Sequence, residues 1–469
     1  MTPSPNPREL FLLLLLLVSL IAYSSRSSSS QPHLVQSELD LGSVTSGGHA
    51  PRRRWLAQAS TIANTQVLTH VPGWTVFDNL YLLNSTLYVV SDEPESMPDI
   101  EFVLSKGLDI ENGKAAEDSR LPTAKELSIV SSKQAASMFQ GHVQTLAGTS
   151  FIVNDPPQFI THYYHFCAEL LFGFWRTYTA LDPRISMNGS TTLRSPDRFM
   201  FTRLDADHWR DYAKMNQLVL RSAFPSTRLS FMEDWQDMSS SGRVFKFSRA
   251  LLADRSAAMI GYNYQRTQRT AASPFALPGP STRSWWLPIR DNVVRLAGLP
   301  ETTGEGTQDL PVITYISRQE WGRRMLVKED HEKLVRALYG LREKYGWEVN
   351  VVSFDNMGRH DQIRLAARTT IMIGVHGNGL TNLLFLKPTP RSTVIEFFYP
   401  EGFAHDYEYT TRALGMVHYG FWGSRSFTSP STPLPAYPEG FQGNSIPIDG
   451  DAVARLCVER LTLSQEFDD

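Results

Sequence analysis

The chain carries a glycine-rich turn, Gly374-Val375-His376-Gly377-Asn378-Gly379-Leu380-Thr381-Asn382. The apolar run 369–373 before it is typical of a buried strand, and 383–388 after it predicts one helical turn that ends at a proline. Glycines let the backbone approach a ligand closely, and the free N–H groups of a helix start favour an anion such as a phosphate. The spacing fits neither G-x-G-x-x-G nor the P-loop. His376 falls at the carboxyl end of the strand, where open α/β sheets bind ligands, so we predict a ligand site here.

The turn belongs to a series of alternating strand and helix patterns. Repeated βα units of this size predict a parallel, doubly wound sheet. We expect strands at 312–317, 347–354, 370–375 and, as the last one, 393–398, helices at 330–344 and 358–368, and a final helix near 449–463.

Charged side chains follow two of these strands at their carboxyl ends. Arg318, Arg323 and Arg324 come after the first strand, and arginine forks match phosphate oxygens in pairs. Glu396 lies at the end of the last strand, where a carboxylate can accept both hydroxyls of a ribose. The alternative for each residue is a surface ion pair. The arginines, Glu396 and the glycine turn thus lie at the carboxyl ends of three strands, and each carries groups that can bind part of a nucleotide. We therefore predict that they converge on one nucleotide.

The chain has 469 residues, too many for one ordinary core, so two lobes are expected. In the first half, 74–82 and 85–90 read as strands of a hairpin, 151–153 as a short strand and 247–255 as a helix. Pro, Thr, Ser and Gly are frequent in 266–310, where we place the boundary. The predicted order is an acceptor-side lobe at 66–300, a nucleotide-sugar-binding lobe at 301–400, and an extension at 401–469 that returns to the first lobe.

An aromatic-rich segment, residues 162–176, predicts a helix in the first lobe. On a 3.6-residue period, His162, His165, Phe166 and Glu169 share one face. Three interpretations remain open: an acid/base face over a cleft, a core helix with satisfied histidines, or a metal site. The H-x-x-H spacing differs from the zincin H-E-x-x-H pattern.

A second acidic motif is Asp205-Ala206-Asp207. Two carboxylates offer hard oxygen ligands, so a D-x-D pair can hold Mn²⁺ against a nucleotide diphosphate. Acidic surfaces also produce this pattern often, and we favour that interpretation.

The composition is that of a globular protein, with 42% apolar and 20% charged residues. The net charge of -3 gives no general attraction to nucleic acid. Only Cys167 and Cys457 occur, which excludes a disulfide scaffold and a cysteine-rich zinc module. They either form one bridge or, as we favour, remain two buried thiols.

The N-terminus is apolar from Leu10 to Tyr23. This run is short for a bilayer span of ~20 residues, and its length is within the ~7–15 residues of a signal-peptide core. Residues 1–23 are therefore predicted to be a signal anchor or a cleaved signal peptide, and 24–65 a disordered stem. Both alternatives place the rest of the chain in the secretory lumen, where the sequons at Asn84 and Asn188 can carry glycans.

A family resemblance rests on four pieces of sequence. They are Tyr315-Ile316-Ser317-Arg318 with Arg323-Arg324, the glycine turn 374–382, Val394-Ile395-Glu396, and His162-Tyr163-Tyr164-His165-Phe166 with Glu169. As a set, they resemble glycosyltransferase family 61 over most of residues 150–400. The family usually has alanine where this chain has Asn378, a departure that leaves backbone contacts intact.

The resemblance implies a GT-B-like α/β protein, with two Rossmann-type lobes facing a cleft and an inverting transfer from a UDP-sugar that requires no metal or other cofactor. Family members include plant β-1,2-xylosyltransferases of N-glycans and eukaryotic O-linked GlcNAc transferases. We therefore expect xylose or N-acetylglucosamine to be moved to a hydroxyl of a glycan or protein by a single-pass type II membrane protein of the Golgi or endoplasmic reticulum. The expected donor-binding residues are Arg318, Arg323, Arg324, His376, Gly377, Asn378, Gly379 and Glu396.

Inversion needs one base to take the acceptor proton. The candidates are Glu169, His165 and Asp207, in that order, with His162 on the acceptor side. The rival functions are a non-catalytic lumenal module that binds a nucleotide or glycan, and a secreted hydrolase. No G-x-S-x-G nucleophile elbow supports the hydrolase.

Overall fold

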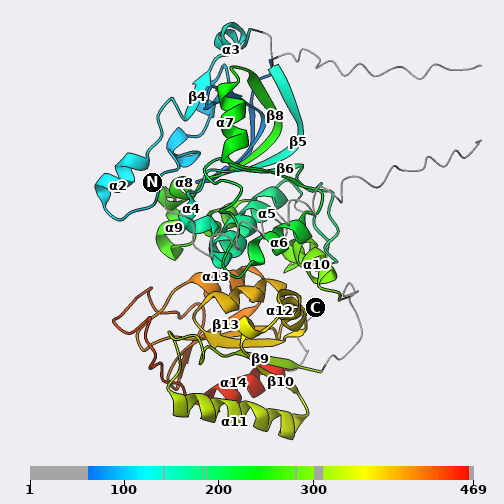
Figure 1. Ribbon diagram of the computed structural model, residues 1–469, viewed down its shortest axis with the longest axis vertical. Coiled ribbons are helices and arrows are strands. Elements are labelled where there is room, and N and C mark those ends of the chain that lie inside the picture. The colour runs from blue at the N-terminus through cyan, green and yellow to red at the C-terminus, as the bar shows by residue number, and fades with distance from the viewer. Residues whose placement is uncertain are drawn as a thin grey trace, which may run out of the picture. The chain divides into compact units, whose positions relative to one another are not determined.

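The computed structural model describes residues 62–140, 143–182, 184–186, 188–279, 283–299 and 310–463. The predicted membrane or signal segment 1–23 and all but the last residues of the predicted stem 24–65 lie outside these ranges. Within the described part of the chain, no helix is both long and apolar enough to cross a bilayer. Two multi-stranded sheets make this a mixed α/β protein (Figure 1).

The first sheet has eight strands in the order β4-β3-β2-β8-β5-β6-β7, with β1 paired to β2. It mixes antiparallel pairs around β2 with parallel pairs around β5, so it differs from the all-parallel sheet of a Rossmann lobe. Its strands are β1 (Gln66–Val71), β2 (Trp74–Leu83), β3 (Thr86–Val90), β4 (Leu127–Val130), β5 (Val143–Val153), β6 (Arg198–Phe201), β7 (Arg228–Ser230) and β8 (Val244–Ala253).

The predicted hairpin is confirmed by β2 and β3, which pair antiparallel from Leu83 and Thr86 outward. Asn84 and Ser85 form the two-residue turn with φ angles of 49° and 67°. Positive φ at both central positions gives a turn whose twist matches that of the strands.

The helix predicted at 247–255 is wrong, because most of this segment is β8, a central strand between β2 and β5. Ala250 to Ala253 are all buried, and a short apolar run covered on both faces has no period that separates a strand from a helix. A helix, α8 (Arg255–Ile260), begins only after Asp254, whose side chain accepts a hydrogen bond from the N–H of Ala257.

Helices cover both faces of the first sheet. Residues 151 and 251 point to the face covered by η3 and α5, whereas 152 and 252 point to the face covered by α7. The helices of this half are η1 (Pro94–Ser96), η2 (Ile100–Phe102), α2 (Lys114–Arg120), α3 (Ser132–Phe139), α4 (Pro157–Ile160), η3 (His165–Leu171), α5 (Phe172–Thr179), α6 (Met215–Ala223), α7 (Met232–Ser240), α8, α9 (Tyr262–Thr267), η4 (Thr270–Ala276), η5 (Arg283–Trp286) and α10 (Leu287–Leu296).

The second sheet has the order β10-β9-β11-β12-β13-β14. Its first five strands are parallel, which confirms the predicted doubly wound pattern in this half. The strand at 393–398 is not the last one, since the sheet continues with β13 and an antiparallel β14. The strands are β9 (Val312–Ile316), β10 (Glu348–Val352), β11 (Ile371–Val375), β12 (Thr393–Phe397), β13 (Val417–Trp422) and β14 (Arg425–Phe427).

The region predicted as a C-terminal extension lies mainly with the second sheet. It supplies β13 and β14, and its last helix α14 packs beside α11 on one face of that sheet. Helix α13 reaches the first half at both of its ends: the hydroxyl of Tyr164 donates to the carbonyl of Asp406, and Nε1 of Trp285 donates to the carbonyl of Ala413. The helices of the second half are α11 (Lys328–Tyr345), η6 (Phe354–Asn356), α12 (Arg359–Arg368), η7 (Asn378–Phe385), α13 (Asp406–Ala413) and α14 (Gly450–Leu461).

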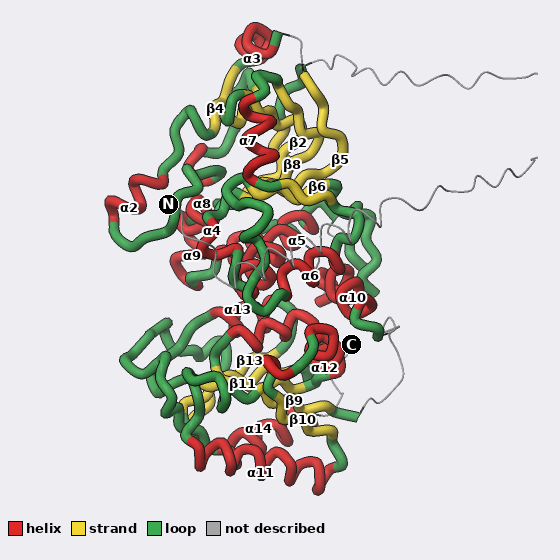
Figure 2. The backbone as a smooth tube through the Cα atoms, in the orientation of Figure 1, coloured by secondary structure: helices red, strands yellow, loops and turns green. Residues whose placement is uncertain are grey.

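One continuous core joins the two sheets. It runs from the η3 face of the first sheet through α5, α6 and α10 to Met372 and Val394 of the second sheet. Figure 2 shows these helices as a layer between the two sets of strands. The favoured interpretation of the cysteines is confirmed: Cys167 in η3 and Cys457 in α14 are both free and buried.

Candidate functional site

The glycine turn lies where the second sheet reverses its winding. In the order β10-β9-β11-β12-β13, successive strands are added on one side of β9 and then on the other. Ligands of doubly wound sheets bind at this point, outside the carboxyl ends of the two central strands. Here those ends lead into the loop 317–325 after β9 and the turn 376–379 after β11.

Two arginines of the loop after β9 meet the glycine turn. Nη1 of Arg324 donates to the carbonyl of His376 at 3.0 Å. Arg318 lies so close to Gly377 that a Cβ atom there would be 2.6 Å from its Nη1. A side chain at position 377 would therefore have to displace the guanidinium of Arg318. Arg323, on the same loop, is exposed.

These arginines have hydrogen-bond donors to spare. Nε and Nη2 of Arg318 and Nε of Arg324 are buried and have no hydrogen-bond partner in the part of the chain that the structure describes. Burial, and then the charge of Arg324, lower the pKa of Arg318 to about 10. A buried donor without a partner is costly, and two adjacent guanidinium groups repel each other. An anion bound at the turn would remove both penalties.

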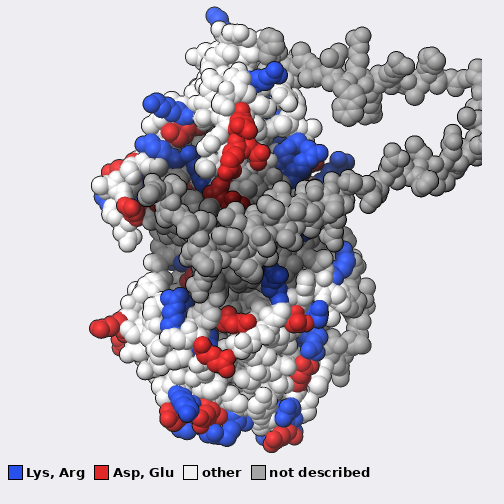
Figure 3. All heavy atoms as spheres, viewed as in Figure 1, with Lys and Arg blue, Asp and Glu red and all other residues white. Residues whose placement is uncertain are grey.

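The surface charge around this pair is mixed. On the face seen in Figure 3, basic and acidic side chains stand next to one another over the second sheet. The positive charge of the arginine pair is therefore not part of a basic surface over that face.

Glu396 holds histidines, whereas we had expected it to contact a ribose. It is fully buried in β12, and its Oε1 and Oε2 lie 2.6 Å from Nδ1 of His376 and 2.8 Å from Nε2 of His418. Both oxygens are therefore occupied, and the carboxylate fixes the ring of His376 beside the turn. His376 also contacts the ring of Tyr407, with 5.5 Å between the centroids.

The first half of the chain contributes a second histidine–glutamate pair. The helix predicted at 162–176 is confirmed, since η3 runs directly into α5, but η3 winds with π-helical turns where a regular α-helix was expected. Such turns are rare and occur often at functional sites. His165 Nδ1 lies 2.7 Å from Glu169 Oε2, and the ring of His162 packs 4.9 Å from that of His165. Phe166, predicted on the same face, points into the core.

Glu169 is compensated by buried arginines. Nη1 of Arg255 donates to Glu169 Oε2 at 2.7 Å, and Nη1 of Arg269 lies 3.5 Å from Oε1. Burial alone would raise the pKa of Glu169, but Arg255, His165 and Arg269 outweigh it and hold the pKa well below its usual range. Asp155 pairs with Arg255 in turn, yet burial raises the pKa of Asp155 to about 6. Glu169 is thus an ion-paired carboxylate.

The two pairs are brought together by contacts between the halves. The N–H of Tyr164, beside His165, donates to Oδ1 of Asn378 in the glycine turn at 3.2 Å. Arg269 also donates to Asp406 Oδ1 at 2.7 Å. His162 lies close enough for Arg324 to affect its charge: burial, and then His165, lower the pKa of His162 to about 4, with Arg324 adding to the shift.

The remaining predicted residues lie elsewhere on the surface. Asp207 is exposed, and its neighbour Asp205 is bonded to His208 at 2.7 Å. Asn84 and Asn188 are exposed, as glycan-bearing side chains must be. Within the described ranges, no group of three His, Cys, Asp or Glu side chains could hold a metal ion.

Sequence reasoning missed four residues of this site: Arg255, Arg269, Asp406 and His418. Their segments carried no motif, and 247–255 was assigned to the wrong element. The one available signal was Asp254-Arg255, a capping aspartate with a charged neighbour at the end of an apolar run.

The model of the family described as glycosyltransferase 61 matches residues 151–395. The matched region contains η3, the arginine loop and the glycine turn. An 87-residue segment is 39% identical to the EGF domain-specific O-linked N-acetylglucosamine transferase of Mus musculus, and it covers 18% of this chain and 15% of that relative. With a family match over more than half of its length, this chain belongs to the glycosyltransferase 61 family.

Proposed function

We propose that the protein is an inverting transferase that moves a sugar from a UDP-sugar to a hydroxyl group of a glycan or protein. The observation that carries this proposal is the anion site of Arg318 and Arg324 at the glycine turn. In a GT-B arrangement, the diphosphate would accept the spare guanidinium N–H groups, and these charge-assisted bonds would stabilise the departing UDP. No metal ion is required in this scheme.

We assign the role of general base to His165, in preference to Glu169 and Asp207. Glu169 is held ionised by two arginines, and a carboxylate with a strongly lowered pKa accepts a proton poorly. His165 is partly exposed, and its Nδ1–H can donate to Glu169, which leaves the Nε2 lone pair free. Asp207 is solvent-exposed.

The reaction then proceeds by a single displacement. The acceptor oxygen attacks the anomeric carbon from the face opposite the diphosphate, and a new C–O bond forms as the bond from that carbon to the phosphate oxygen breaks. The acceptor proton goes to Nε2 of His165. UDP leaves with the bonding electron pair, and its charge is stabilised by Arg318 and Arg324. One displacement inverts the configuration at the anomeric carbon.

Xylose and N-acetylglucosamine are the donor sugars that we favour. The relative from Mus musculus is named as an O-linked N-acetylglucosamine transferase, which supports the second sugar over a short matched segment. We place the reaction in the lumen of the Golgi or endoplasmic reticulum, with residues 1–23 as a membrane anchor. The apolar run in that segment and the sequons at Asn84 and Asn188 support this location.

Thermal unfolding of the full chain with UDP, UDP-xylose or UDP-N-acetylglucosamine, each with EDTA or Mn²⁺, tests donor binding. A ligand at 100 times its Kd adds about 2.7 kcal/mol of stability. We expect one UDP-sugar to stabilise the wild type in EDTA and to lose this effect in Arg318→Ala. The exposed Arg342→Ala on α11 is the matched control. Stabilisation that survives Arg318→Ala would contradict the assigned site, and stabilisation only with Mn²⁺ would contradict the metal-free scheme.

Release of UDP in the presence of an acceptor tests catalysis. We expect His165→Ala to keep donor binding and to lose roughly 10²–10⁴-fold in transfer, the usual contribution of a general base. Binding of UDP without transfer by the wild type, over a panel of glycan and peptide acceptors, would favour a non-catalytic module.

A further inference from the structure

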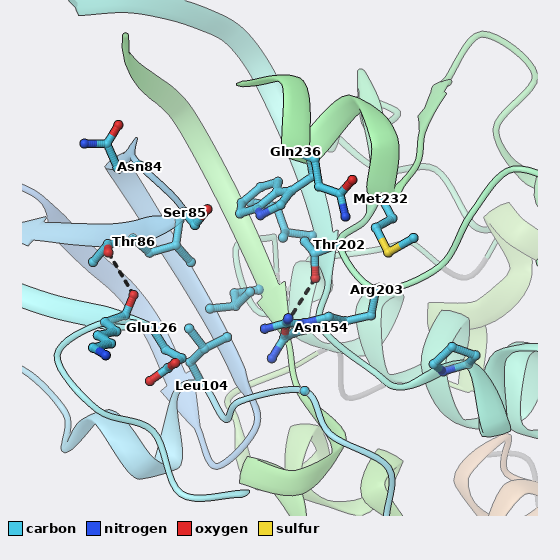
Figure 4. Close-up of a pocket in the computed structure, with 17 residues that line it drawn as sticks. Asn84, Ser85, Thr86, Leu104, Glu126, Asn154, Thr202, Arg203, Met232 and Gln236 are labelled. Carbon is cyan, nitrogen blue, oxygen red and sulfur yellow. Dashed lines mark hydrogen bonds between the residues drawn. The ribbon is translucent and has the colours of Figure 1, made fainter. Parts of the chain in front are cut away.

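A cavity of about 630 Å³ lies in the first half of the chain, away from the glycine turn (Figure 4). Its floor includes Ile152 and Leu252, which point to the α7 face of the first sheet. Their neighbours, residues 151 and 251, face the opposite side, where η3 packs. The cavity and the His165–Glu169 pair are therefore separated by the thickness of the sheet.

The walls of the cavity combine one aromatic side with polar groups. Trp235 and Gln236 of α7 line one side, and the hairpin turn 84–86 lines the other. The indole of Trp235 is partly exposed, and it stacks on Phe247 at 6.3 Å with an interplanar angle of 15°. The ring is therefore held in a fixed orientation, which a contact surface for a ligand requires.

The polar end is built from Asn154, Thr202 and Arg203, which converge in Figure 4. The hydroxyl of Thr202 and Nε of Arg203 donate to Oδ1 of Asn154 at 3.1 and 3.0 Å. Nη1 and Nη2 of Arg203 make no hydrogen bond to any residue that the structure describes. A Cβ atom at Gly107 would lie 2.5 Å from Nε of Arg203, so this glycine leaves room for the guanidinium.

The cavity shares its supporting strands with the catalytic pair. Asn154 follows β5 and lies at the cavity, while the next residue, Asp155, pairs with Arg255 on the other side. Likewise Asp254 accepts from Nδ2 of Asn154 at 2.7 Å, and the next residue, Arg255, holds Glu169. Successive residues of extended chain point to opposite faces, so the ends of β5 and β8 serve both places.

The groups on these walls define the kind of ligand. The cavity lies within the size range of small-molecule sites. The lining includes the basic Lys125 and Arg203 and the acidic Glu126, and none of the cavity's polar side chains is a buried donor without a partner, unlike Arg318 at the glycine turn. The lining therefore does not favour an anionic ligand, and its many polar groups disfavour a lipid. An indole surface beside guanidinium and amide groups suits a ring with an apolar C–H face and a hydroxyl rim.

We propose that this cavity is a second saccharide-binding site, which holds a neutral sugar unit apart from the UDP-sugar. The C–H face of the sugar rests on Trp235, and its hydroxyls accept from Arg203 and bond to Gln236. This assignment needs neither transfer nor UDP, so it stands or falls separately from the proposed function.

Calorimetric titration of the full chain with methyl β-D-xylopyranoside, methyl α-D-mannopyranoside or N,N′-diacetylchitobiose tests the site. The titrations are run with UDP present and also in Arg318→Ala, so that binding at the glycine turn is separated. We expect at least one sugar to bind saturably in both settings. Arg203→Ala combined with Gln236→Ala should weaken that binding at least tenfold, which corresponds to about 1.4 kcal/mol.

The matched controls are Glu233→Ala, on α7 outside the cavity, and the exposed Arg243→Ala. Both should leave the affinity unchanged, and all variants can be checked for folding by their thermal unfolding. No saturable binding of any of the three sugars, equal affinity in the double variant, or competition by UDP would each overturn the proposal. Because Trp235 also packs against Phe247, the surface residues Arg203 and Gln236 give the cleaner test.

Discussion

The two histidine–glutamate pairs of the site have the same hydrogen bond and different surroundings. His165 and Glu169 are joined at 2.7 Å, and His376 and Glu396 at 2.6 Å, each through Nδ1. Glu169 also touches two buried arginines, whereas the other partner of Glu396 is a second imidazole, that of His418.

This difference separates the tasks of the two pairs. Glu169 is kept ionised by Arg255 and Arg269, which it shares with Asp155 and Asp406, and it fixes the ring of His165. Among the residues that the structure describes, only imidazoles form hydrogen bonds with the side chain of Glu396, and it fixes His376 beside Arg324 at the glycine turn. Under the proposed function, the first pair takes the acceptor proton and the second shapes the donor site.

The largest expected effect is that of Glu169→Gln. Removing one partner from a buried ion pair costs about 3–5 kcal/mol, because the remaining charge stays buried and unpaired. We expect a loss of this size in urea unfolding of Glu169→Gln. Glu396→Gln is the matched change, and it should cost clearly less, since imidazoles can exist uncharged. Equal losses would remove the distinction between the two pairs.

The acid dependence of stability should carry two opposing contributions from the Glu169 cluster. The pKa of Asp155 is raised to about 6, so its burial as a carboxylate destabilises the fold above pH 6 by up to roughly 3 kcal/mol. This penalty is relieved as the pH falls from 6 towards 4. The pKa of Glu169 is lowered, so its stabilisation is complete above the unfolded value of about 4.3 and is lost at lower pH.

The measurement is the free energy of unfolding between pH 3 and pH 7. Asp155→Asn should abolish the gain in unfolding free energy that appears as the pH falls from 6 to 4. Glu169→Gln should flatten the decline in unfolding free energy below pH 4.3. An unchanged profile in Asp155→Asn would show that Asp155 is not the group that titrates near pH 6.

A smaller effect is expected from the contact between Arg269 and Asp406, which links the first pair to the second half. Asp406→Asn removes a hydrogen bond between charged groups, worth about 1.5–3 kcal/mol. We expect a stability loss in that range together with slower transfer, because Arg269 would shift towards Glu169. Asp361→Asn, which breaks the exposed pair with Arg364, should cost about 0–1 kcal/mol and leave transfer unchanged. Equal effects would argue against a link between the halves.

The smallest effect is expected from Asn378→Ala, which removes the hydrogen bond from the N–H of Tyr164. A neutral hydrogen bond contributes about 0.5–1.5 kcal/mol, and donor binding should persist because Arg318 and Arg324 are untouched. Asn292→Ala is the matched control, since its amide bonds the carbonyl of Ala223 far from the turn. A loss of UDP binding in Asn378→Ala alone would show that this side chain contacts the donor.

The local sequence pattern was sufficient to predict the second sheet and the edge of that sheet at which we propose the donor binds. The strands and helices between 312 and 397 alternate at lengths typical of βα units, and the arginines and the glycine turn follow adjacent strands. The first half was less readable, because β8 is apolar on both faces and η3 departs from the regular helical period. The prediction placed Glu396 at the correct edge of the second sheet but expected a ribose as its partner. The side chain contacts His418 instead, which comes from a strand that was not predicted.

The sequence by itself determined the doubly wound sheet and placed the arginine loop and the glycine turn at the carboxyl ends of adjacent strands. These features depend on residues close together in the chain and on the period of their side chains. The tertiary structure alone decided which carboxylate is paired with arginines and which one contacts two histidines. Arg255 and Arg269 lie 86 and 100 positions after Glu169, and only folding brings them to it. Protonation and hydrogen bonding depend on burial and neighbouring charge, which contacts distant in sequence create.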